Sequence, residues 1–164
     1  MNRRKVPKLA LFPLTAEINQ KGHLLIGGCD VVELAKEFGT PLYLFDELTL
    51  RHRCREFKKE FGRYYPGTLV IYAAKAFTNK ALILMLKEEG LGLDVVSGGE
   101  LSIARSVDFP PDKVYFHGNN KAPEELNLAL DWRVGRIVVD NFYELELLNG
   151  LAVKRGISQD ILLR

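Results

Sequence analysis

Cysteine is scarce in this chain, and several common signals are absent. Only two cysteines, Cys29 and Cys54, occur among 164 residues, and neither has a metal-type spacing. Two lone thiols indicate a reducing cytoplasm, and both are expected to be small apolar core residues. No apolar run reaches the roughly 18 residues that a transmembrane helix needs. The N-terminus also lacks the apolar stretch and the cleavage site of a secretory signal.

The chain also lacks a large excess of charge of one sign. The formal net charge is +2, which is too small for the electrostatic footprint of a nucleic-acid-binding protein. The basic cluster at residues 3–5 is expected to be a solvated, frayed end. There is no P-loop, no Gly-x-Gly-x-x-Gly after a predicted strand and no Gly-x-Ser-x-Gly elbow. With 47% hydrophobic and 27% charged residues, the composition is that of an ordinary globular domain.

The second part of the chain contains a strand–helix repeat. Its helices are indicated by Asn79 and Asn141 as N-caps, Pro123 at a first helical position and Gly156 at a C-terminal stop. The repeat length is 21 to 24 residues, which fits one strand, one helix and two short loops. The predicted strands are short runs rich in β-branched or aromatic residues: 69–72, 93–96, 114–116, 137–139 and 161–163.

Repeated strand–helix units predict parallel strands with right-handed crossovers. Two architectures are compatible with five such units: a complete doubly wound open sheet and part of a (β/α)₈ barrel. The periodicity does not choose between them.

The first 68 residues follow a different pattern. Residues 18–26 predict a hairpin with its turn near Lys21 and Gly22. Asp30 resembles the start of a capping box, and Gly39 could end the helix that follows. Residues 40–45 are expected to be extended, and a longer amphipathic helix comes next. The apolar face of that helix contains Leu50, Cys54, Phe57 and Phe61.

Polar side chains follow each predicted strand, where parallel-sheet proteins place their function. Lys75 follows the first strand and is flanked by alanines and Phe77. Such surroundings would desolvate the amine and lower its pKa, a condition for a nucleophile that forms a Schiff base. The alternative is a strand-end lysine whose ammonium reaches water.

Each of the other candidates has two interpretations. Asp94 could be a charge partner near Lys75, or it could bond to backbone amides of the next loop. Residues 97–100 could form a glycine loop that suits an anion, or a plain turn with an N-cap. His117 could be a base or a hydrogen-bonded structural residue, and Asn119 could belong to a tight turn.

As a set, these motifs resemble one enzyme family. Residues 72–77, Tyr-Ala-Ala-Lys-Ala-Phe, resemble the first-strand motif of the alanine-racemase-like, fold-type III pyridoxal-phosphate enzymes. Residues 94–101, Asp-Val-Val-Ser-Gly-Gly-Glu-Leu, resemble the second-strand motif of the diaminopimelate decarboxylases within that family. Residues 117–121 and 139–141 fit the same subgroup in the expected order, and residues 40–43 resemble its entry to the barrel domain.

The resemblance implies an α/β fold and a partial (β/α)₈ barrel. Residues 41–164 would supply the first five strands of the cofactor-binding barrel, and residues 1–40 would contribute to a second β-domain. The chain would then be incomplete, because the family's phosphate-binding glycine loop and the acidic partner of the pyridine nitrogen lie in later strands. We therefore expect these 164 residues to be inactive and marginally stable alone.

The resemblance also implies the chemistry. The cofactor would be pyridoxal 5'-phosphate, and the catalytic residue Lys75 would form its Schiff base. The expected reaction is decarboxylation of meso-2,6-diaminopimelate to L-lysine, the last step of lysine biosynthesis. The expected enzyme is a cytoplasmic homodimer that binds a small amino acid and no nucleic acid, membrane or metal. An ornithine- or arginine-type decarboxylase, an amino-acid racemase and a non-catalytic homologue remain alternatives. The implied cofactor-binding residues are Lys75, Asp94, Ser97, Glu100, His117 and Asn119.

Overall fold

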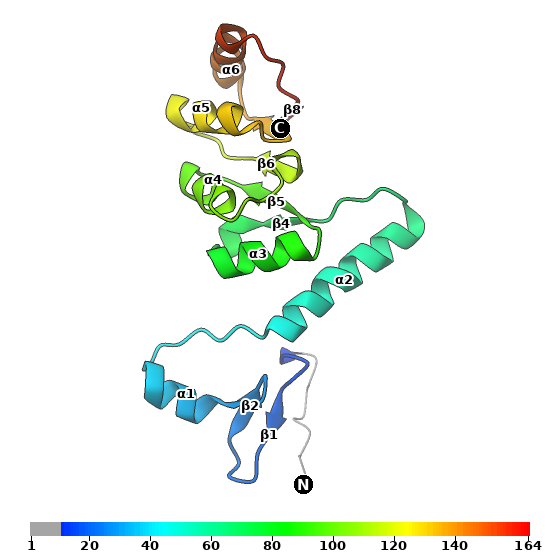
Figure 1. Ribbon diagram of the computed structural model, residues 1–164, viewed down its shortest axis with the longest axis vertical. Coiled ribbons are helices and arrows are strands. Elements are labelled where there is room, and N and C mark those ends of the chain that lie inside the picture. Colours follow the sequence, from blue (N-terminus) through cyan, green and yellow to red (C-terminus); the bar gives the residue numbers. More distant parts are fainter. Residues whose placement is uncertain (1–10) are drawn as a thin grey trace. The chain divides into compact units, whose positions relative to one another are not determined.

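The computed structural model describes residues 11–164, and the basic cluster at residues 3–5 lies outside them. The chain divides into two compact units, Met1–Lys59 and Glu60–Arg164. We call them the N-terminal unit and the strand–helix unit. The first contains a three-stranded antiparallel sheet and the second a five-stranded parallel sheet (Figure 1).

The N-terminal unit is built on a hairpin whose turn lies at Lys21 and Gly22, so that prediction is confirmed. Asn19 Oδ1 accepts hydrogen bonds from the N–H groups of Lys21 and His23, each 2.9 Å long. Gly22 has a φ of +78°, in the left-handed region that glycine enters without steric cost. The sheet consists of three short strands, β1 (Glu17–Ile18), β2 (Leu24–Ile26) and β3 (Cys29–Asp30).

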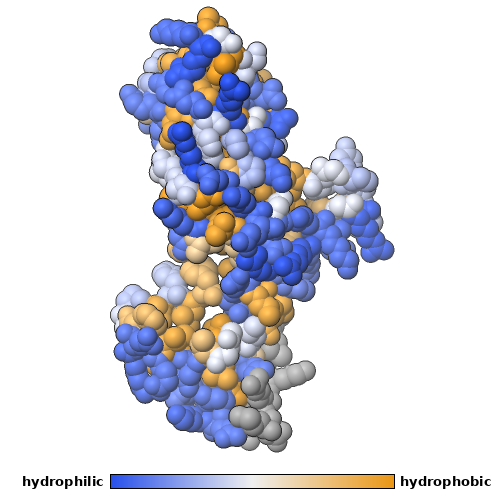
Figure 2. All heavy atoms as spheres, in the orientation of Figure 1, coloured by the Kyte–Doolittle hydropathy of each residue, from blue (hydrophilic) through white to orange (hydrophobic). Residues whose placement is uncertain are grey.

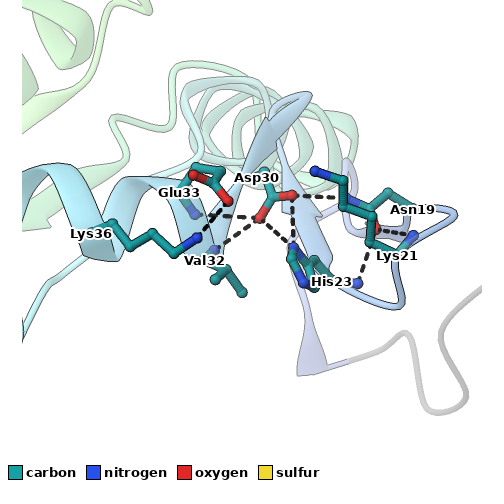
Figure 3. Close-up of polar contacts among 7 residues, drawn as sticks. All are labelled: Asn19, Lys21, His23, Asp30, Val32, Glu33 and Lys36. Atoms are coloured by element: carbon teal, nitrogen blue, oxygen red, sulfur yellow. Dashed lines mark hydrogen bonds and ion pairs between the residues drawn. The ribbon is translucent and has the colours of Figure 1, made fainter.

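Asp30 caps the first helix and links it to the hairpin (Figure 3). Its Oδ1 accepts hydrogen bonds from the N–H groups of Val32 and Glu33 at the start of α1 (Val31–Phe38), and His23 Nδ1 lies 2.9 Å from Oδ2. Although burial alone would raise the pKa of the Asp30 carboxyl, these contacts hold it below its ordinary value. The charged cap therefore adds stability above the ordinary pKa, and this is lost as pH falls through the lowered one.

The long helix α2 (Glu47–Tyr64) forms where the sequence predicted it, but its apolar face is only partly covered. Cys54 is buried, whereas Phe57 and Phe61 are 54% and 57% exposed. An amphipathic pattern identifies the side of a helix that can be buried, without supplying the partner that covers it. Cys29 is exposed, so its prediction as a core residue was wrong. It lies in β3, which pairs on one side only.

The N-terminal unit has little core of its own. Of its described apolar residues only Ala16 and Cys54 are buried, and hydrophobic side chains are visible on its surface (Figure 2). Residues 40–45 form neither helix nor strand, and the Thr40–Pro41 peptide bond is cis. Polar contacts such as those of Asp30 therefore carry much of its local order. Its exposed large apolar side chains include Leu11, Phe12, Leu14, Phe38, Tyr43, Phe45 and Leu48.

The strand–helix unit contains five parallel strands in the order of the chain. They agree with the predicted strands to within two residues at each end. The α/β class and the parallel topology are therefore confirmed. The strands are β4 (Ile71–Ala73), β5 (Gly92–Val95), β6 (Val114–Phe116), β7 (Arg136–Val139) and β8 (Ile161–Leu163).

Helices separate the strands and follow one another in the same order (Figure 1). Asn79 and Asn141 are N-caps as predicted, and their side chains accept from Leu82 N (2.8 Å) and Glu144 N (2.9 Å). Gly156 ends the last helix in a left-handed conformation. The helices are α3 (Lys80–Glu88), α4 (Gly98–Arg105), α5 (Pro123–Trp132) and α6 (Phe142–Arg155), with short 3₁₀ turns η2 (Ala74–Ala76) and η3 (Pro111–Lys113).

The core lies between the sheet and these helices. Side chains alternate along a strand, so one face of the sheet carries buried apolar residues and the other carries Asp94, Tyr115 and Arg136. These three residues are in register across β5, β6 and β7. The buried residues on the first face are Leu93, Val95, Val114, Phe116, Ile137 and Val139.

Two features are absent from residues 11–164. No helix there is both long and apolar enough to cross a membrane. No group of three or more His, Cys, Asp or Glu side chains is arranged so that it could hold a metal ion.

The cap of α6 provides a test of this local reasoning. We expect Asn141→Ala to lower the free energy of unfolding by about 1 kcal/mol, because the Glu144 N–H loses its acceptor. The matched control is Asn149→Ala in the exposed middle of the same helix, which should be neutral or slightly stabilising. Urea unfolding followed by circular dichroism measures both. Equal effects of the two substitutions would contradict the cap.

Candidate functional site

The carboxyl ends of the parallel strands meet at one edge of the sheet, and the predicted site residues lie there. Lys75 lies in η2, directly after β4. The Tyr72 hydroxyl donates a 3.0 Å hydrogen bond to the carbonyl oxygen of Phe77 and closes the turn that carries Lys75. Lys75 itself is exposed, so the interpretation as a strand-end lysine that reaches water fits the structure and the interpretation as a desolvated amine does not. The 3₁₀ turn places Ala74 in the buried position and leaves the lysine outside.

Asp94 and His117 come together at this edge. Asp94 lies in β5 and His117 directly follows β6, the parallel neighbour of β5. Asp94 Oδ1 lies 3.7 Å from His117 Nε2, a distance for an ion pair rather than a hydrogen bond. The same oxygen is buried and has no hydrogen-bond partner among the described residues. The interpretation of Asp94 as a side chain bonded to backbone amides therefore does not fit Oδ1. An unsatisfied buried acceptor costs free energy, so it marks a place where a donor is missing.

The loop after β5 is a capped helix start. Ser97 Oγ accepts from Glu100 N (3.3 Å), and Glu100 Oε2 accepts from Val96 N (2.7 Å). The turn-and-cap interpretation of residues 97–100 is therefore correct. Gly98 N donates to Glu125 Oε1 at 2.6 Å. Three backbone N–H groups that could hold an anion, those of Val96, Gly98 and Glu100, are therefore already bonded within the protein. Glu100 thus shapes this loop with at least one of its carboxylate oxygens.

The loop after β6 is a sharp turn that lies next to the loop after β5. His117 N donates to the Val95 carbonyl oxygen at 2.8 Å, which continues the ladder beyond β6. Gly118 has a φ of +117°, and a Cβ there would lie 3.3 Å from the Val96 carbonyl oxygen. Asn119 follows and is exposed. The turn therefore holds His117 against the neighbouring strand and leaves Asn119 on the outer surface of the edge.

Sequence reasoning missed the side chain that joins these two loops. Glu125 Oε1 accepts from Gly98 N, and its Oε2 accepts from Ala122 N at 2.9 Å. One carboxylate thus serves the starts of α4 and α5. Glu125 lies in the first turn of α5, two residues after Pro123. Its position three residues after the N-cap was the available signal for the local bond, but nothing in the sequence indicated the second one.

The last strand ends in another pair at the same edge. Arg164 Nη1 donates to Asp140 Oδ1 at 3.0 Å, and Arg164 N donates to the Val139 carbonyl oxygen. On the face of the sheet, Arg136 Nη1 donates to the Tyr115 hydroxyl at 2.9 Å. The edge thus combines an exposed amine, an unsatisfied carboxylate beside an imidazole, and a guanidinium. Such a set can bind a small molecule that carries both carbonyl and anionic groups.

Comparison with known proteins gives consistent results. Residues 47–164 match a family model described as pyridoxal-dependent decarboxylase, pyridoxal binding domain. Diaminopimelate decarboxylases from Bacillus subtilis and Bacillus methanolicus are 51% and 49% identical over 92% and 93% of this chain. The crystal structure of diaminopimelate decarboxylase from M. jannaschii is 36% identical over 92% of this chain, with a TM-score of 0.84. It is consistent with the predicted partial barrel.

The matched segment is a limited part of each relative. This chain spans 34% and 35% of the two Bacillus enzymes and 35% of the M. jannaschii chain. The likeness therefore concerns about a third of each of those proteins.

The unsatisfied oxygen of Asp94 leads to a stability test. Without cofactor, we expect Asp94→Asn to leave the melting temperature unchanged or to raise it, because a carboxylate with an unpartnered buried oxygen is removed. Asp140→Asn is the matched control. Its carboxylate has similar exposure but is paired with Arg164, so its loss should lower the melting temperature slightly. Differential scanning calorimetry measures both melting temperatures. A melting temperature of Asp94→Asn several degrees below that of Asp140→Asn would contradict the missing-donor interpretation.

Proposed function

This chain belongs to the pyridoxal-dependent decarboxylase family by its pyridoxal binding domain, and we propose that it is part of a diaminopimelate decarboxylase. The proposed reaction is decarboxylation of meso-2,6-diaminopimelate to L-lysine. The observation that carries the proposal is the exposed Lys75 amine at the sheet edge that also holds Asp94 and His117. The roughly 50% identity to curated diaminopimelate decarboxylases supports the choice of substrate.

The residues at this edge fit pyridoxal 5'-phosphate. Lys75 has an accessible amine for covalent attachment, and Asp94 Oδ1 is a buried acceptor in need of a donor. When bound, the cofactor supplies an electron-accepting ring for the loss of CO₂ from an amino acid. We propose Lys75, Asp94, Ser97, Glu100, His117 and Asn119 as the residues of this chain that hold it.

These residues have different proposed roles. Lys75 attaches the cofactor and is the proposed catalytic residue. Asp94 accepts a hydrogen bond at Oδ1, and His117 lies within ion-pair distance of that oxygen. Ser97 and Glu100 act through the shape of the loop after β5, because their side chains accept hydrogen bonds from that loop's own backbone. Asn119 is exposed and available to a ligand at the outer side of the edge.

The proposal extends to the organisation of the whole protein. Residues 41–164 would be the first part of a (β/α)₈ barrel, and residues 1–40 would join a second β-domain. We propose a homodimer in the cytoplasm, where a reducing environment suits two cysteines outside any disulfide. The substrate is a small amino acid, which agrees with an M. jannaschii structure described as a co-complex with L-lysine.

Trapping the cofactor tests the role of Lys75. With excess pyridoxal phosphate and borohydride, peptide mass mapping of the longest natural form should find the label on Lys75. We expect Lys75→Ala to lose the label and to reduce decarboxylation by at least about 10³-fold, since the covalent step is removed. Lys80→Ala, which removes another exposed lysine nearby, should keep both. A wild-type protein labelled elsewhere, with no label on Lys75, would overturn the assignment.

Substrate choice has its own test. Release of CO₂ by the longest natural form should be fastest with meso-2,6-diaminopimelate, compared with ornithine, arginine and lysine at equal concentrations. We expect a preference in kcat/KM of about 100-fold or more, because a site built to bind the second carboxylate of diaminopimelate rejects substrates that lack it. A higher kcat/KM with ornithine or arginine would replace the proposed substrate. Racemisation without CO₂ release would replace the proposed reaction.

A further inference from the structure

Lys121 is the most deeply buried charged side chain at this edge that the proposed function leaves unused. It lies at the end of the loop after β6, two residues before α5, and its side chain is 1% exposed. Its ammonium donates to the carbonyl oxygens of Gly118 and Val138, both at 2.8 Å, and to Glu144 Oε1 at 2.6 Å. All three donor positions of the ammonium are thus used within the protein.

The partner carboxylate is also buried. The side chain of Glu144 is 5% exposed, and it lies in the first turn of α6. The helix itself is capped by Asn141, so the Glu144 carboxylate is not needed at the cap. It turns to Lys121 instead. The ion pair therefore connects the loop after β6 with the start of α6.

The bonded carbonyl groups show what this pair holds in place. Gly118 lies between His117 and Asn119, so its carbonyl oxygen fixes the turn that carries both proposed site residues. Val138 belongs to β7, one strand further along the sheet. One ammonium thus ties the loop after β6 to the neighbouring strand and to the next helix.

A buried ion pair of this kind is a weak source of stability. Removal of both charges from water costs free energy that the attraction between them does little more than offset, so two apolar side chains of similar volume can be as stable. Two apolar side chains could not, however, donate to the Gly118 and Val138 carbonyl oxygens. Lys121 therefore differs from an apolar residue in that it holds these two carbonyl groups in place, and not in the stability that it adds.

We propose that Lys121 is a positioning residue, which sets the turn containing His117 through the Gly118 carbonyl oxygen and is itself held by Glu144. This role rests on the proposed function, because the turn matters to catalysis only if His117 borders the cofactor. Lys121 does not touch the substrate or the cofactor in this proposal. It acts through the backbone of residues 117–119.

The test uses the longest natural form of the protein and three variants. Lys121→Met with Glu144→Met replaces the ion pair by an apolar pair, so that no unpaired charge stays buried. Glu144→Gln keeps an acceptor for Lys121 and both carbonyl contacts. Lys87→Met is the matched control, since Lys87 also donates to a carbonyl oxygen, that of Val107 at 2.9 Å, but at the opposite end of the helices. Each variant is measured by melting temperature, hydrogen exchange of the peptide containing residues 117–120, and kcat and KM.

We expect the apolar pair to melt within a few degrees of the wild type while its 117–120 peptide exchanges on the order of tenfold faster. Its kcat/KM should fall by roughly 10- to 100-fold, since small displacements in an active site have such effects. Lys87→Met should keep wild-type exchange in this peptide. Glu144→Gln leaves the buried ammonium with an acceptor but without its counter-charge, so its exchange should lie between those of the control and the apolar pair. Wild-type exchange and kcat/KM in a folded apolar pair would overturn the proposal, as would equally accelerated exchange of this peptide in Lys87→Met.

Failure of the proposed function would look different. If the wild type releases no CO₂ from any of the amino acids tested, the proposed decarboxylase function is wrong. The exchange of residues 117–120 would still decide whether Lys121 sets this turn.

Discussion

The parallel direction of the five strands is the constraint on which the rest of the strand–helix unit depends. Parallel neighbours require a crossover helix each time, and every crossover begins at the same edge of the sheet. The carboxyl ends of the strands and the N-termini of α3 to α6 therefore gather in one place. Residues separated by about 20 positions in the sequence, such as Lys75 and Asp94 or Asp94 and His117, become neighbours through this rule alone.

The same arrangement creates a demand for acceptors, because each helix start has free amide groups. The structure meets this demand largely with carboxylates and amides of its own side chains. Glu100 serves the loop before α4, and Glu125 serves two helix starts at once. Glu144 neutralises a buried lysine. Asp94 differs from them, because its buried Oδ1 has no hydrogen-bond partner among the described residues. That contrast separates a carboxylate available for chemistry from carboxylates that shape the edge.

Much of this fold could be predicted from the sequence, because the relevant signals are local. The strands were predicted from short runs of β-branched residues. The caps at Asn79 and Asn141 were predicted because their side chains can bond to the backbone three residues ahead. The edge that carries Lys75, Asp94 and His117 followed from topology. Long-range pairing was not predictable in this way. The bonds from Glu125 to Gly98 and from Lys121 to Glu144 join residues 27 and 23 positions apart.

Burial was the least predictable property. The alanines around Lys75 indicated a desolvated amine, but a single 3₁₀ turn gives the buried position to Ala74. The apolar face of α2 was identified correctly, yet Phe57 and Phe61 remain more than half exposed. Sequence patterns describe which side of an element is apolar. Exposure depends on what packs against it, and that information lies elsewhere in the fold.

The complete burial of Lys121 has a consequence for chemical selectivity. Aldehydes and other electrophiles react with an amine only when it is accessible and can lose its proton. Lys121 has an ammonium enclosed by three acceptors, whereas Lys75 lies in the open. Of these two lysines, only Lys75 is offered to an aldehyde. An electrophile that enters this edge is therefore steered toward one amine by geometry before any difference in basicity matters.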